Sequence, residues 1–191
     1  MAMPQVERIW TRAEVLALPD DGNRYELIGG ELLVSPSPRL VHQLALYELF
    51  HLVDGYVRRH RLGVTGLSPA DLDLGLGDVS QPDLFVVRHP EDPARDGWRG
   101  VGVPLLAVEI ISPMTARHDR ITKRRRYQTA GVASYWIVDL DLGLVERWHP
   151  NDQEPTLERG TVRWYPSAAV PPLEIALDAY FRPEWRTAPK P

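Results

Sequence analysis

The sequence contains two carboxylates and a lysine whose surroundings suit them to chemistry on phosphate: Asp83, Glu109 and Lys123. Glu109 stands near the end of the apolar run 104–113, which is typical of one strand covered on both faces. An unpaired carboxylate in such a strand costs several kcal/mol, so Glu109 should be paired with a cation, protonated or bound to a metal ion. A structural salt bridge is the simplest of these possibilities.

Asp83 follows Pro82 at the start of another predicted strand. Two carboxylates on adjacent strands can converge on one hard cation, and Mg²⁺ is typically held by one or two carboxylates together with water and substrate phosphate. The backbone carbonyl of Ile110, next to Glu109, is a further candidate ligand. Bound Mg²⁺ lowers the pKa of a coordinated water and stabilises the charge on a phosphodiester during its hydrolysis.

The helix predicted after the Glu109 strand carries Asp119, Lys123 and Tyr127 at i, i+4 and i+8, on one face. If this helix packs back on the sheet, the Lys123 ammonium could orient or deprotonate the attacking water, or neutralise the phosphorane. The alternative is that Asp119 and Lys123 form an ordinary i,i+4 ion pair, worth a few tenths of a kcal/mol.

The elements that must position these residues alternate between helices and strands. Thr11 and Glu14 form a capping box ahead of a short helix. Gly29-Gly30 is a hairpin turn between two strands. We predict strands at 24–28, 31–34, within 64–76, at 81–87, 104–113, 133–140, 144–148, within 155–164 and at 173–176, with helices at 40–61, 115–130 and 177–181. This order predicts one mixed α/β domain, residues 1–191, with a central sheet.

Composition narrows the class of protein. The chain has 191 residues, 43% hydrophobic and 25% charged, and no cysteine, which excludes disulfides, zinc–thiolate sites and a thiol nucleophile. It has no secretory signal and no apolar run long enough for a membrane span, so we expect a cytoplasmic protein that does not bind membranes. A net charge of −4 argues mildly against non-specific binding of nucleic acid.

Basic residues are nevertheless concentrated in two places. On the helix after Glu109, we expect Arg120, Arg124 and Arg126 to include phosphate contacts, although three such residues cannot all face one ligand. The basic cluster 58–61 lies in the last turn of the long helix, where it suits the helix dipole and is simplest as a solvated helix end.

Several segments together resemble the PD-(D/E)XK nuclease superfamily and, within it, the Uma family of putative restriction endonucleases. Singly they are weak, but their order and spacing are fairly specific. They are residues 25–32, Ser35-Pro36, His42, residues 82–84 and 108–113, Asp119, Lys123, Tyr127, Gly131-Val132 and residues 135–139.

This resemblance implies a restriction-endonuclease-like core of αβββαβ order, with an N-terminal hairpin and extra C-terminal strands. It implies a DNA endonuclease using Mg²⁺, or Mn²⁺, held by Asp83 and Glu109, often as a homodimer. The superfamily lysine stands two residues after the acid, where this chain has Ile111, so the resemblance moves that role to Lys123. Glu31 also matches a family acid.

Other interpretations remain open at this point. The fold could serve as a DNA-binding or protein-interaction module without catalysis, or the metal chemistry could act on another phosphate ester. Among supporting residues, His42 and Tyr127 could be structural or could contact the site. Four further residues have simpler roles: Glu26 as an ordinary hairpin carboxylate, Asp139 as a turn residue, and Trp136 and Trp148 as core.

Overall fold

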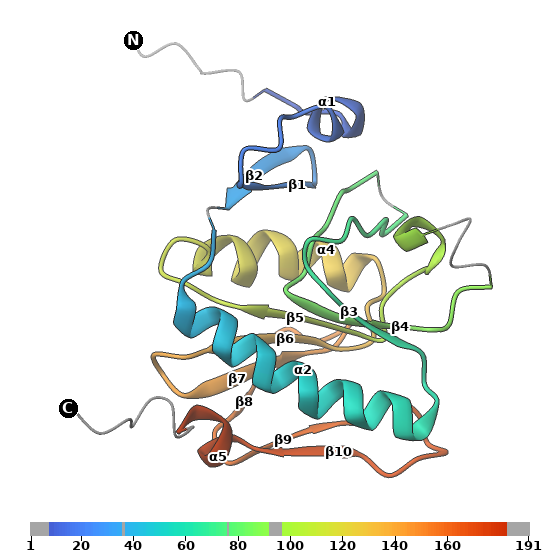
Figure 1. Ribbon diagram of the computed structural model, residues 1–191, viewed down its shortest axis with the longest axis vertical. Helices are drawn as coiled ribbons and strands as arrows, with labels where there is room; N and C mark the ends of the chain where they lie inside the picture. The colour runs from blue at the N-terminus through green and yellow to red at the C-terminus, as the bar shows by residue number, and fades with distance from the viewer. Residues whose placement is uncertain (1–7, 36, 76, 92–96, 183–191) are drawn as a thin grey trace.

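A six-stranded mixed sheet lies at the centre of the computed structural model, which describes residues 8–35, 37–75, 77–91 and 97–182 (Figure 1). Its strand order is β3-β4-β5-β6-β7-β8, and within it β5 and β6 run parallel while the other neighbours are antiparallel. The strands are β3 (Val64–Leu67), β4 (Leu84–Val87), β5 (Leu106–Ile110), β6 (Tyr135–Asp139), β7 (Leu144–Trp148) and β8 (Thr156–Glu158). The predicted α/β class with a central sheet is confirmed.

Two hairpins stand apart from this sheet. At the N-terminal end, β1 (Arg24–Ile28) pairs with β2 (Glu31–Ser35) across the predicted glycine turn, where Gly29 and Gly30 both have positive φ. Near the C-terminal end, β9 (Thr161–Trp164) pairs with β10 (Leu173–Ala176). Figure 1 shows the first hairpin on the α4 side of the sheet and the second beside α2.

The helices divide between the two faces. On one face the central helix α2 (Leu40–His60), β9, β10 and α5 (Leu177–Phe181) pack against even-numbered residues such as Val108 and Trp136. On the other face Tyr127 of α4 (Arg124–Thr129) packs with Ala107 and Ile137. Successive strand residues alternate between faces, so Asp83 and Glu109 face α4. The short helix α1 (Arg12–Leu16) carries the predicted capping box.

The segment after β5 differs from the α-helix predicted at 115–130. Helical structure begins at Ala116, and residues His118–Lys123 form a π-helix, η2, before α4. Arg124 N–H donates to the carbonyl of Asp119, five residues back. The Thr115 side chain bonds to the residues before the helix, because its Oγ1 accepts from Ser112 N–H at 3.1 Å. Local sequence pattern does not distinguish this geometry from an α-helix.

Other predicted bounds shift slightly. The strand expected at 81–87 begins at Leu84, and the described part of 64–76 contains the strand β3 and then an isolated bridge between Leu72 and Ser80. The long loop before β5 contains a 3₁₀ turn, η1 (Gly97–Gly100). Pro36 lies outside the described residues. None of the helices in the described ranges is long and apolar enough to cross a membrane.

Candidate functional site

Strand register places Asp83 and Glu109 side by side. Leu84 pairs with Val108 in the antiparallel β4–β5 ladder, so one step further along each strand sets Asp83 opposite Glu109. The backbone N–H of Ile110 donates to Asp83 Oδ2 at 2.8 Å, which fixes this carboxylate at the end of β5. Both side chains are buried, with 2% and 1% of their residue surfaces exposed.

Asp83 is held as a carboxylate by two further groups. Arg24 donates to its Oδ1 at 2.6 Å, and His42 Nε2 lies 3.1 Å from its Oδ2. Burial alone would raise the pKa of Asp83, but the hydrogen bond from His42 and the attraction of Arg24 outweigh it and lower that pKa. The predicted supporting residue His42 therefore touches the site.

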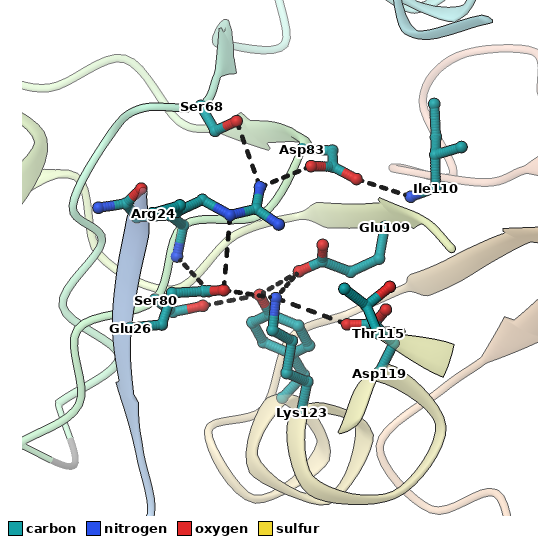
Figure 2. A network of polar contacts seen from close by, with 12 residues as sticks. Arg24, Glu26, Ser68, Ser80, Asp83, Glu109, Ile110, Thr115, Asp119 and Lys123 are labelled. Carbon is teal, nitrogen blue, oxygen red and sulfur yellow. Dashed lines mark hydrogen bonds and ion pairs between the residues drawn. The ribbon is translucent and has the colours of Figure 1, made fainter. Parts of the chain in front are cut away.

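Lys123 reaches the same site from the helical segment after β5, at the end of the π-helix that stands where the sequence predicted an α-helix. Its Nζ lies 2.9 Å from Glu109 Oε1, 2.8 Å from Glu26 Oε2 and 3.5 Å from Asp119 Oδ1 (Figure 2). Burial would lower the pKa of Lys123, but the attraction of these three carboxylates raises it well above its ordinary value. Lys123 is therefore a cation and a hydrogen-bond donor in this arrangement.

Tyr127, the third residue of the predicted helix face, also contacts Glu109. Its hydroxyl donates to Glu109 Oε1 at 3.2 Å and lies 2.7 Å from Ser80 Oγ. Burial raises the pKa of Glu109 well above its ordinary value, against the attraction of Lys123. We expected buried Glu109 to need a cation or a proton. The structure gives it an ion pair with Lys123 and a raised pKa.

The site contains more acids than cations. Four buried carboxylates, Glu26, Asp83, Glu109 and Asp119, meet two permanently charged groups, Arg24 and Lys123. Burial also raises the pKa of Asp119. Surplus negative charge in a buried site is costly, and a proton or a further cation relieves it.

The donor set fits a hard divalent cation. Glu26 Oε2 and Asp119 Oδ1 are buried and, apart from their ion pairs with Lys123, have no hydrogen-bond partner in the described part of the chain, so each can accept a further cation. Among the described residues, no three His, Asp or Glu side chains are arranged around one metal position. A site here would resemble the Mg²⁺ type, in which one or two carboxylates are completed by water and phosphate.

The remaining predicted residues are Glu31 and the three arginines. Glu31 is exposed at the start of β2, on a pocket that Asp119 and Lys123 also line. The three arginines make contacts within the protein: Arg120 with Asp139 and Glu146, Arg124 over the Trp148 ring, and Arg126 with Asp78.

The predicted roles of Asp139 as a turn residue and of Trp136 and Trp148 as core residues are confirmed. Asp139 Oδ1 accepts from the N–H groups of Asp141 and Leu142, as a turn residue does. Trp136 and Trp148 are buried in the core.

Sequence reasoning missed Arg24 and Glu26, and the interpretation of Glu26 as an ordinary hairpin carboxylate was wrong. Glu26 is fully buried, and its Oε1 accepts from Gln81 N–H at 2.8 Å. The available signal was their i, i+2 spacing, which places both side chains on one face of β1. Since Asp83 and Glu109 were already predicted to be buried on the main sheet, a strand face that carries both an arginine and a glutamate was a candidate to pack against them.

The chain thus has an α/β fold with a central mixed sheet and buried acids at the neighbouring ends of β4 and β5. The model of the family described as Uma2, putative restriction endonuclease, matches residues 12–178, and the chain belongs to this family. The predicted resemblance is thereby confirmed. None of the curated proteins is significantly similar to the chain.

A solved structure has the same fold. It is the crystal structure of a putative nuclease belonging to DUF820 from Anabaena variabilis ATCC 29413, which matches with a TM-score of 0.73 and 19% sequence identity. The match covers 90% of this chain and 97% of that one. At this identity the likeness establishes the fold alone.

Proposed function

We propose that this protein is a metal-dependent DNA endonuclease that hydrolyses phosphodiester bonds. The observation that carries the proposal is the meeting of Lys123 with Glu109, beside Asp83, in a buried site with surplus negative charge. This is the acid–acid–lysine set that the chemistry requires, although the lysine comes from a helix and not from the strand. Membership of the Uma2 family supports the same reaction class.

Each residue has a role in this proposal. Asp83, Glu109 and the Ile110 carbonyl would hold Mg²⁺ or Mn²⁺, which supplies a coordinated water of lowered pKa and a positive charge for the phosphate. His42 orients Asp83. Lys123, whose pKa is raised, acts as a donor that orients the attacking water or stabilises the developing phosphorane charge, not as the base.

Tyr127 and Asp119 support Glu109 and Lys123. The Tyr127 hydroxyl shares Glu109 Oε1 with Lys123 and restricts the rotation of that carboxylate. Asp119, one π-helical turn before Lys123, lies beside the ammonium and limits its position. A site held in this way has its charges in place before substrate arrives, which is the condition for electrostatic catalysis.

A plasmid-nicking assay with Mg²⁺ or Mn²⁺ tests this function. The parent should nick DNA only with a divalent cation, and Glu109→Ala and Lys123→Ala should each reduce the rate by at least about 100-fold. Arg125→Ala, an exposed change on the same helix as Lys123, is the matched control and should leave the rate unchanged. An Asp83→Ala variant that cut DNA as fast as the parent would refute the mechanism.

One observation favours a second candidate, a nuclease-like module that binds DNA or protein without catalysis. Both acids proposed as metal ligands already have cationic partners, Arg24 and Lys123. Calorimetric titration with Mn²⁺ separates the two functions, because the catalytic protein must bind the ion and lose that binding in Glu109→Ala. A non-catalytic module need not bind it.

We also propose that the working form is a homodimer, because cutting both strands of DNA requires two sites. Light scattering at micromolar concentration should give twice the mass of the chain. A monomeric mass, with and without a DNA duplex, would exclude this.

A further inference from the structure

Arg24 enters the acid cluster from outside the main sheet. Within the described residues, its strand β1 pairs with β2 and forms an isolated bridge from Leu27 to Val79, but it is not a strand of the main sheet. Its guanidinium donates to Asp83 Oδ1 at 2.6 Å and to Ser68 Oγ at 3.4 Å. The Arg24 Nε is buried and has no hydrogen-bond partner among the described residues. The shortest bond that fixes the guanidinium is therefore to an acid proposed as a metal ligand.

The two cations of the site differ in how firmly they are held. Lys123 is only 3% exposed at its side chain and lies within 3.5 Å of three carboxylates. The Arg24 side chain is 20% exposed, and its second carboxylate, Glu26 Oε2, is 3.7 Å from Nε. Of the two, Arg24 can leave at lower cost, because part of it already contacts solvent.

We propose that Arg24 is an exchangeable cation: it neutralises Asp83 until a divalent ion binds that carboxylate, and its guanidinium then positions the phosphodiester of the substrate. The second half of this inference rests on the proposed nuclease function. A planar guanidinium has donors spaced for the oxygens of a phosphate. Arg24 already lies beside the carboxylate at which the reacting phosphate would be bound.

A purely structural salt bridge makes the opposite prediction for metal affinity. If Arg24 merely held Asp83 in place, its removal would loosen the site and weaken metal binding. If Arg24 competes for Asp83, removing its charge frees the carboxylate and tightens metal binding. The sign of the change in affinity therefore separates the two roles.

Calorimetric titration with Mn²⁺ alone, without DNA, measures that sign. We expect Arg24→Gln to lower the Kd for Mn²⁺ about tenfold. Arg24→Lys, which keeps a positive charge, should stay near the parent value. Arg12→Gln is the matched control, since Arg12 pairs with Asp73 outside the cluster, and it should not change the Kd. An Arg24→Gln variant that bound Mn²⁺ no more tightly than the parent would overturn the competition.

Nicking by the same variants tests the phosphate role. At saturating Mn²⁺, Arg24→Gln should cut plasmid at least about tenfold more slowly than the parent and need more DNA for half-maximal rate. Tighter metal binding with undiminished cleavage would overturn the phosphate half alone. If the parent itself did not cut DNA, the proposed nuclease function would be wrong. The Mn²⁺ titration would still show whether Arg24 and the metal ion compete for Asp83.

A measurement on the unmodified protein covers the case in which Arg24→Gln does not fold. The nuclear magnetic resonance signal of the Arg24 Nε–H group should shift on titration with diamagnetic Mg²⁺, as the guanidinium leaves Asp83. The Arg12 signal should remain in place. An Arg24 signal that did not move at saturating Mg²⁺ would overturn the exchange.

Discussion

Lys123 Nζ lies 2.9 Å from Glu109 Oε1, although the two residues are 14 positions apart and belong to different elements. The in-strand position that the superfamily motif gives to lysine is Ile111, which packs with the cluster around Tyr127 and Ile137. The helix after β5 therefore supplies the ammonium that the strand does not. Every prediction about this site depends on that helix keeping its place on the sheet.

Lys123→Met should destabilise the protein strongly. It removes the cation from three buried carboxylates and leaves their charge uncompensated, which costs about 3–5 kcal/mol for a broken buried pair. Urea unfolding at neutral pH measures the loss. Arg125→Met, exposed on the same helix, should change the free energy of unfolding by less than about 0.5 kcal/mol. Equal losses in both variants would mean that the buried ion pairs contribute little.

Glu26→Gln and Glu31→Gln distinguish the two acids of the N-terminal hairpin. Glu26 is buried against Lys123, whereas Glu31 is exposed. The amide introduced by Glu26→Gln keeps an acceptor for Gln81 N–H, so we expect stability to change by no more than about 1 kcal/mol. Nicking should fall at least about tenfold for Glu26→Gln and less than about twofold for Glu31→Gln. The reverse order would restore Glu31 as the functional acid.

Asp119→Asn should change how stability depends on pH. Burial raises the pKa of Asp119, so the folded protein holds this proton more tightly than the unfolded chain. Its stabilising contribution is complete below the unfolded pKa, near 3.8, and is lost as pH rises through the raised folded pKa.

Metal-free urea unfolding between about pH 4 and pH 8 measures this effect. The free energy of unfolding of the parent, minus that of Asp119→Asn, should decrease as pH rises. A difference that stayed flat or increased across this range would show that ionised Asp119 is fully compensated by Lys123.

Two glycines near the long helix should respond to alanine in opposite directions. A Cβ at Gly63, where φ is +155°, would lie 1.8 Å from the Val87 carbonyl oxygen, so Gly63→Ala should destabilise by about 2 kcal/mol or more. A Cβ at Gly55, inside α2, meets nothing within 4 Å among the described residues. Gly55→Ala should stabilise by about 0.5–1 kcal/mol through helix propensity. Thermal unfolding compares them, and similar effects of both changes would contradict this.

The sequence was most informative where a single residue broke a strong local pattern. A charge inside an apolar strand made Glu109 conspicuous, and the proline before Asp83 together with the helical spacing of Lys123 completed the set. Arg24 and Glu26 were missed because their burial depends on where a separate hairpin packs, and alternation along a short strand does not encode that contact. The arginines of the helical segment after β5 were ambiguous because their acidic partners, such as Asp78 and Glu146, are distant in sequence.

The π-helix at His118–Lys123 has a consequence for how this segment tolerates insertions and deletions. Its widened turn accommodates one residue more than an α-helix of the same path, and Asp119 and Lys123 both point inward across it. Deleting one residue here removes the extra residue of the widened turn, so the later turns keep their path but the spacing of Asp119 and Lys123 falls from four residues to three. Length changes between Asp119 and Lys123 should thus abolish function more readily than substitution of the exposed Ile121.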